Sequence, residues 1–145
     1  MKKLSRLVSI IYRQGTRFFD CSLSASGIGF GQQFFFIRIY EEPGISMQKL
    51  AQTGHFDKGT VTKAVKKLEE QGYLLREPDT EDKRIHHLYI TEAGKKIVDK
   101  IYEKRNHWNE ILSAGMSSEE KEQAEKLLSK MAENAYSYMN DRKVK

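Results

Sequence analysis

A run of lysines near the middle of the chain has the chemistry to bind a polyanion. Between residues 58 and 68 there are four cations and no acid, whereas clusters of acids lie at 41–42, 69–70, 77–82 and 119–125. A basic segment in a chain of mixed charge produces a directed positive field, which suits nucleic acid. A solvated lysine-rich helix face would contain the same residues. The four cations are Lys58, Lys63, Lys66 and Lys67.

A second pair of cations lies in the polar stretch 77–84, where Lys83 and Arg84 directly follow Asp82. Arginine is favoured in a narrow minor groove because the negative potential is strongest there. We expect Asp82 to orient the guanidinium of Arg84 through a charge-assisted hydrogen bond. An ordinary polar turn is the alternative interpretation.

The elements around these cations predict a helix-turn-helix followed by a β-hairpin. Ser46 is placed to cap a helix over 47–53, and Asp57 to cap a second helix over 58–71. The spacing of the apolar residues in the second helix turns its lysines outward. Strands over 73–76 and 85–90 then enclose the polar loop, with alternate residues of the second strand facing the core.

This arrangement predicts how the segment would contact a duplex. The amino-terminal half of the second helix would meet base edges in the major groove, its later lysines would meet phosphates, and the backbone amides at its start would also be phosphate donors. The hairpin tip would reach the neighbouring minor groove. The expected DNA-binding residues are Ser46, Lys49, Lys58, Thr60, Thr62, Lys63, Lys66, Lys67, Lys83 and Arg84, with Asp82 supporting the wing.

Helices are predicted on both sides of this region, so the chain is expected to be mainly α with one small β-hairpin. A long amphipathic helix fills the first twenty residues and ends before a Ser/Gly-rich connection at 22–29. An almost wholly apolar helix over 32–42 follows, and Thr91 caps another that ends near residue 112. Ser117 and Glu120 have the spacing of a capping box at the start of the last helix. The basic residues 142–145 are expected to fray.

Composition limits the class of protein. The chain has 145 residues, 39% hydrophobic and 31% charged, with a net charge of +5, which is typical of one soluble basic domain. Its single cysteine excludes an internal disulfide and a cysteine-based zinc site. The longest large apolar run, 34–37, is too short to cross a bilayer, and no signal-peptide cleavage pattern follows the first basic residues. We therefore expect a cytoplasmic protein without a membrane partner.

Six short motifs follow one another along the chain: 58–63 (Lys-Gly-Thr-Val-Thr-Lys), 67–69 (Lys-Leu-Glu), 71–74 (Gln-Gly-Tyr-Leu), 82–84 (Asp-Lys-Arg), 88–94 (Leu-Tyr-Ile-Thr-Glu-Ala-Gly) and 117–120 (Ser-Ser-Glu-Glu). In these motifs the sequence resembles the MarR (multiple-antibiotic-resistance regulator) family of winged helix-turn-helix transcription factors. The resemblance implies a winged helix-turn-helix with long amino- and carboxy-terminal dimerisation helices. The expected ranges are 1–30 for the first dimerisation helix and connection, 31–91 for the DNA-binding region and 92–145 for the last dimerisation helices.

The resemblance also implies a homodimer in which the first, fifth and sixth helices interlock. The apolar stripes of the terminal helices agree, because exposed they would form a patch too large for a monomer. A two-fold dimer would bind a pseudo-palindrome with half-sites about 34 Å apart. The expected interface residues are Leu7, Ile11, Trp108, Ile111, Leu127 and Met131.

Members of this family usually repress transcription, and many release DNA when a small phenolic or anionic effector binds. Aromatic residues that would line such a pocket, unless they are ordinary core residues, are Phe18, Phe19, Phe30, Phe34 and Tyr40. Some members sense peroxides through a cysteine near the first helix, which makes Cys21 a candidate redox residue. A passive buried or half-exposed cysteine is the default interpretation.

Other functions receive little support from the sequence. No Gly-rich phosphate loop, metal-binding His-Glu pattern or nucleophile elbow is present, so we expect neither an enzyme nor a bound cofactor. His86 and His87 are adjacent on a strand and point to opposite faces, so no metal site is expected. A winged-helix module that binds protein instead of DNA is the remaining alternative.

Overall fold

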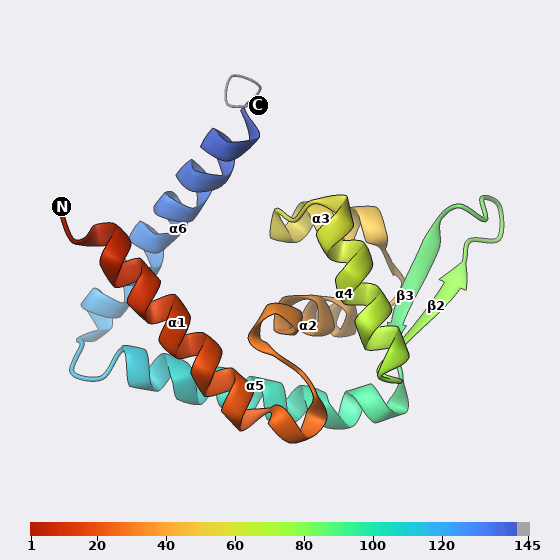
Figure 1. Cartoon of the computed structure of the whole chain (residues 1–145), viewed down its shortest axis with the longest axis horizontal. Coiled ribbons are helices and arrows are strands. Elements are labelled where there is room, and N and C mark those ends of the chain that lie inside the picture. Colours follow the sequence, from red (N-terminus) through yellow and green to blue (C-terminus); the bar gives the residue numbers. More distant parts are fainter. Residues whose placement is uncertain (142–145) are drawn as a thin grey trace. The chain divides into compact units, whose positions relative to one another are not determined.

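The chain folds into helices and one small sheet (Figure 1). The computed structural model describes residues 1–141, so the basic tail expected to fray lies outside the described residues. Packing divides the chain into two compact units, Met1–Trp108 and Asn109–Lys145. The three functional ranges expected from the sequence remain a prediction.

In order, the elements are α1 (Leu4–Ser22), α2 (Gln33–Glu41), β1 (Ile45–Ser46), α3 (Met47–Gly54), α4 (Lys58–Glu70), β2 (Leu74–Pro78), β3 (His86–Ile90), α5 (Glu92–Leu112) and α6 (Ser118–Asn140), with short 3-10 turns at Ser24–Ser26 and Phe30–Gln32.

Helices α3 and α4 form the predicted helix-turn-helix, and both begin at the predicted caps. The Ser46 hydroxyl accepts a hydrogen bond from the backbone N–H of Lys49, and a carboxylate oxygen of Asp57 accepts one from Thr60. The turn between the helices needs a residue without a side chain at Gly54. A Cβ there would lie 2.5 Å from the Phe34 ring, closer than packed atoms can approach.

The sheet has three antiparallel strands in the order β1-β3-β2, one strand more than the predicted hairpin. β1 has only two residues, and Ile45 pairs with Leu88 of the central strand. β2 begins one residue later than predicted and continues to Pro78, which an edge strand tolerates. The hairpin formed by β2 and β3 projects beyond α4 (Figure 1).

The core of the first unit lies between α2, the helix-turn-helix, the sheet and α5. α2 is buried on several sides, as its composition predicts, and the inward positions of α4 are completely covered. The burial of these side chains holds α4 with its lysine face outward. Core side chains with no exposed surface include Phe36, Ile39, Leu50, Val65, Leu68, Leu88 and Ile101.

The end of α4 is tied to the connection that follows α1. Gly72, at a φ of 81°, ends the helix in the left-handed conformation that glycine adopts without strain. The Tyr73 hydroxyl donates to the Ser26 carbonyl at 2.7 Å, and Gln71 Nε2 donates to the Gly27 carbonyl at 2.8 Å. These contacts fix the carboxy-terminal end of the helix relative to α1.

The second unit consists of the end of α5 and α6. α6 starts at the predicted capping box, in which Ser117 and Glu120 bond reciprocally. None of its described residues is buried within the chain. Among the helices that the structure describes, none is long and apolar enough to cross a membrane. The mainly α winged-helix fold predicted from the sequence is confirmed.

Candidate nucleic-acid interface

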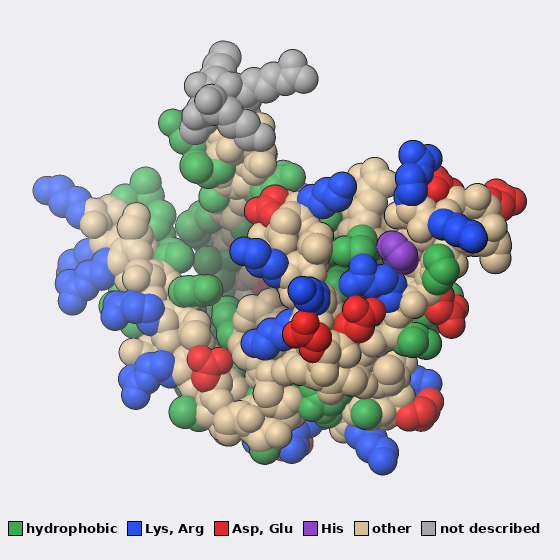
Figure 2. Space-filling model, turned by 45° about the vertical axis from the view of Figure 1, so that its right-hand side comes forward, with side chains coloured by type: hydrophobic (Ala, Val, Ile, Leu, Met, Phe, Trp, Pro, Cys, Tyr) green, Lys and Arg blue, Asp and Glu red, His purple; other side chains and the backbone are tan. Residues whose placement is uncertain are grey.

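α4 presents an exposed basic face. All four of its lysines are exposed, while the helix buries Val61, Val65 and Leu68 on the opposite side. Figure 2 shows Lys and Arg side chains spread over one side of the molecule. No acid interrupts the α4 sequence before Glu69, so the first three turns of the helix carry a net positive charge, with the Asp57 cap as the acid at their start.

The start of α4 differs from the expectation that its backbone amides are ready phosphate donors. Asp57 Oδ1 accepts the Thr60 N–H at 2.7 Å, and this bond is the main reason why the pKa of Asp57 is lowered. A carboxylate therefore already occupies this end of the helix. The Thr62 hydroxyl donates to the Lys58 carbonyl at 2.8 Å, which leaves only its acceptor capacity for a ligand.

Two of the expected DNA contacts at α3 have structural partners. The hydroxyl of Ser46 caps α3, as described above. Lys49 Nζ lies 3.0 Å from Glu42 Oε1, which also accepts from Arg38 at 3.3 Å. The hydrogen bond from Lys49 is the largest cause of the lowered pKa of Glu42. Lys49 therefore offers a partly neutralised charge, in contrast to the lysines of α4.

At the hairpin tip, Asp82 holds Arg84 as the sequence predicts. Asp82 Oδ1 accepts from both the backbone N and Nε of Arg84, and Oδ2 accepts from Nη2, each at 3.0 Å. These bonds lower the pKa of Asp82 and raise that of Arg84. The Arg84 side chain is nevertheless 91% exposed. An oriented guanidinium that remains open to solvent is well suited to contact a phosphate or a groove.

The sequence did not predict the contacts of His87, one of which joins it to a residue 43 positions away. Its Nδ1 lies 2.9 Å from the Gly44 carbonyl oxygen and its Nε2 lies 2.8 Å from Asp79 Oδ1. Asp79 Oδ2 in turn accepts the backbone N–H groups of Glu81 and Asp82. The ring thus connects the hairpin tip to the turn before β1. An aspartate at the start of a polar turn was the available sequence signal for the tip contacts.

The five aromatic residues expected to line an effector pocket fall into separate groups. Phe19 stacks on Phe30, and Phe18 stacks on Trp108 of α5. Phe34 packs instead against Phe35 and Phe56, and Tyr40 is exposed. The first group is a cluster between α1 and the start of α2. Phe19 is a core residue, and Phe18, Phe30 and Phe34 pack against the core, in keeping with the alternative interpretation of these residues.

Gln32 and Cys21, which lie close in sequence to this aromatic cluster, are its polar and redox candidates. Gln32 is 7% exposed, and both atoms of its side-chain amide lack a hydrogen-bond partner among the described residues. Cys21 is exposed, so the expectation of a buried thiol is wrong, and the alternative of a half-exposed one stays open. It lies near the end of α1, on a helix whose buried residues are Gly15 and Phe19. In the described part of the chain, no three His, Cys, Asp or Glu residues cluster as metal ligands.

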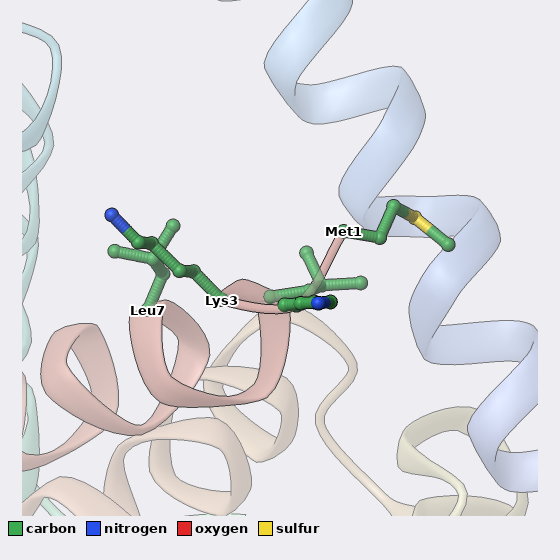
Figure 3. Close-up of a pocket in the computed structure, with 5 residues that line it drawn as sticks. Met1, Lys3 and Leu7 are labelled. Carbon is green, nitrogen blue, oxygen red and sulfur yellow. The ribbon is translucent and has the colours of Figure 1, made fainter.

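Both units have unpartnered apolar faces. In α1, Leu7 and Ile11 of the expected interface are exposed, and Figure 3 shows the start of this helix, where Met1, Lys3 and Leu7 line a surface depression. In the second unit, Ile111 and Leu127 are exposed and Met131 is partly exposed. Trp108 differs, because its indole packs against Phe18 and lies 3.4 Å from the position of a Cβ on Gly15.

Known proteins resemble this chain in sequence and structure. A family model described as the MarR family matches residues 33–86. YybA, an HTH-type transcriptional regulator of Bacillus subtilis, is 40% identical over 104 residues, which cover 72% of this chain and 69% of YybA. A MarR protein from Peptoclostridium difficile has a TM-score of 0.87 and 32% identity over 94% of this chain and 89% of its own. A putative MarR family regulator from Listeria monocytogenes, solved with 26mer DNA, has a TM-score of 0.84 and 25% identity over 94% and 91%.

Proposed function

Because the chain belongs to the MarR family of winged helix-turn-helix transcriptional regulators, we propose that it represses transcription as a homodimer bound to a pseudo-palindromic operator. The observation that carries this proposal is the combination of an acid-free lysine face on α4 with an oriented, exposed arginine at the hairpin tip. Either feature alone is common on protein surfaces, whereas the two together match the two grooves of a duplex.

In this proposal α4 enters the major groove and Arg84 enters the adjacent minor groove. Residues at the start of α4 contact base edges, and its later lysines contact phosphates. Lys49 plays a smaller part, because Glu42 already neutralises some of its charge. The proposed contacts are Lys58, Thr60, Thr62, Lys63, Lys66, Lys67, Lys83 and Arg84.

A homodimer is supported by the apolar faces that the chain leaves exposed. Leu7 and Ile11 are 51% and 45% exposed, and α6 has no buried residue among those described. Exposed apolar surface of this extent on a soluble chain marks an interaction site. A second copy satisfies it symmetrically and places the two α4 helices about one helical turn of DNA apart, about 34 Å.

Selection of bound duplexes from a random pool tests the proposal directly. We expect a pseudo-palindromic consensus with half-sites one helical turn apart. In a salt titration on a selected duplex, Lys63→Gln and Arg84→Gln should each weaken binding, and Lys67→Gln should reduce the log–log salt slope by about 0.9 for its lost phosphate contact. Lys95→Gln is the matched control, since Lys95 pairs with Glu92 on α5.

The same experiment separates DNA binding from the alternative of a protein-binding winged helix. A protein-interaction module would enrich no duplex from the pool and would show no difference between the interface variants and the control. Sedimentation at micromolar concentration tests the dimer independently, because a monomer under these conditions contradicts the proposed symmetry.

We also propose that a small phenolic or anionic effector controls DNA release from a site beside the Phe19–Phe30 stack. The supporting observation is the buried, unpartnered amide of Gln32, because a buried polar group without a partner costs free energy that a ligand or water would recover. Gln32→Leu should abolish release by an effector without weakening DNA binding. A peroxide-sensing role for Cys21 stays a prediction, which fails if Cys21→Ser leaves release by organic peroxide unchanged.

A further inference from the structure

The imidazole of His87 lies where three parts of the first unit meet. His87 is on β3, the central strand, and its ring contacts the turn between α2 and β1 on one side and the hairpin tip on the other. The ring is half-buried, with 33% of its side-chain surface exposed. Both of its nitrogens are within hydrogen-bond distance of an oxygen, at 2.9 Å from Gly44 and 2.8 Å from Asp79.

Both partners of the ring are acceptors only. A backbone carbonyl and an ionised carboxylate have lone pairs and no hydrogen to donate. A neutral imidazole carries one N–H, so one of its two contacts would place a nitrogen lone pair against an oxygen lone pair. The imidazolium donates from both nitrogens. The geometry is therefore complete only when His87 is protonated.

The charges around the ring act in the same direction. Asp79 at the tip and Glu77, its cross-strand neighbour on β2, are the charged groups that act on His87, while β1 places the uncharged Ser46 opposite it. The hydrogen bond to Asp79 is the largest cause of a raised pKa for His87, followed by that to Gly44. The pKa of Asp79 is lowered to about 2, mainly by the same bond to His87. Asp79 is therefore an acceptor throughout the range in which the ring titrates.

The ring is connected to the proposed DNA-binding arginine through a chain of hydrogen bonds. Asp79 Oδ2 accepts the Asp82 N–H at 3.0 Å, and the Asp82 carboxylate holds the guanidinium of Arg84. We propose that His87, in its imidazolium form, is a positioning residue that fixes the hairpin tip to the body of the domain and so presents Arg84 to DNA. This inference rests on the DNA-binding function proposed above.

The proposal predicts DNA binding that weakens as pH rises. Because the folded pKa of His87 is above the ordinary value of about 6.5, the contact is complete below about pH 6.5 and is lost as pH rises through the raised value. Apparent affinity is proportional to the fraction of protein in the competent state. We expect the wild type to bind a selected duplex about 3- to 10-fold more weakly at pH 8 than at pH 6.

Binding of His87→Gln at several pH values tests the positioning role. This variant should bind at pH 6 about as weakly as the wild type binds at pH 8, with a flatter pH profile. His86→Gln is the matched control, since it removes the neighbouring histidine from the opposite face of β3 and should keep the wild-type profile. Asp79→Asn should move the midpoint of the wild-type profile to lower pH. Identical profiles for His87→Gln and the wild type would overturn the positioning role.

An NMR titration of the ring nitrogens in the free full-length protein provides a readout that does not depend on DNA. Both nitrogens of His87 should be protonated at pH 6, and the ring should lose its second N–H proton with a pKa above the ordinary value of about 6.5. A ring with a single N–H at pH 6 would overturn the proposal even if the protein binds DNA normally. If the wild type binds no duplex at any pH, the DNA-binding function fails, and the role of His87 in it fails as well.

Discussion

Replacing Asp82 by Asn tests whether the hairpin tip presents Arg84 in a fixed direction. In the structure one carboxylate oxygen accepts from the backbone N and Nε of Arg84, and the other accepts from Nη2. An asparagine keeps one acceptor oxygen and loses both the second one and the charge. The arginine remains in the chain, so the variant separates its orientation from its presence.

The size of the effect follows from the exposure of Arg84. With 91% of its side chain open to solvent, almost nothing besides Asp82 restrains the guanidinium. The rotamer freedom of an unrestrained arginine sets an upper limit of roughly 30-fold on the loss of affinity. Because asparagine preserves one of the two acceptors, we expect DNA binding to weaken about 3- to 10-fold. The salt slope should stay close to that of the wild type, since no cation is removed.

Fluorescence anisotropy on a selected duplex at fixed salt measures this loss, with Glu81→Gln as the control. Both substitutions remove one negative charge from the tip, and that change alone strengthens the attraction to DNA. Only Asp82 makes side-chain contacts to Arg84. If Asp82→Asn binds DNA as tightly as Glu81→Gln, the hydrogen bonds from Asp82 do not position Arg84, and this prediction is refuted.

Three further predictions concern stability and assembly. Gly54→Ala should destabilise the fold by about 1–3 kcal/mol in urea unfolding, because a Cβ would meet the Phe34 ring, whereas Gly31→Ala has open space and should be neutral. The pKa of Asp79 is about 2, so its contribution to stability is complete between about pH 4 and 6.5 and is lost as pH falls through 2. The difference in stability between wild type and Asp79→Asn should therefore shrink as pH falls from about 4 through 2, and a constant difference over that range would contradict it. Ile11→Glu should shift the protein from dimer to monomer in sedimentation, and an unchanged dimer would exclude this face of α1 from the interface.

Most helices and strands could be predicted from residues close to them in sequence. The helix boundaries agree with the caps at Ser46, Asp57 and Ser117, because a capping side chain acts within three residues of its own position. The Asp82–Arg84 contact was also predictable, since its partners are two residues apart. Gly72 ends α4 for the same local reason.

Contacts between distant segments were not predictable in the same way. β1 has two residues and exists because Ile45 pairs with Leu88, 43 positions later. The ring of His87 meets the Gly44 carbonyl across the same separation. Neither segment has a composition that indicates its partner, since register depends on the packing of the whole sheet.

The aromatic residues show a different limit. Phe34 and Phe19 are similar in character along the sequence, yet one packs beside the helix-turn-helix and the other beside Phe30. Apolar periodicity indicates which side chains are buried and not which of them share a cluster. For this reason the sequence grouped the five aromatic residues into one pocket, whereas the fold places them in separate clusters.

The hydrogen bonds from Gln71 and Tyr73 attach the carboxy-terminal end of α4 to the rest of the first unit. The carbonyls of Ser26 and Gly27 that accept these bonds belong to the connection leaving α1, the helix that carries the exposed Leu7 and Ile11. These two hydrogen bonds therefore couple the position of α1 to the carboxy-terminal end of α4. In the proposed homodimer, a movement of α1 would therefore reach α4 at its carboxy-terminal end, behind the residues proposed to contact base edges.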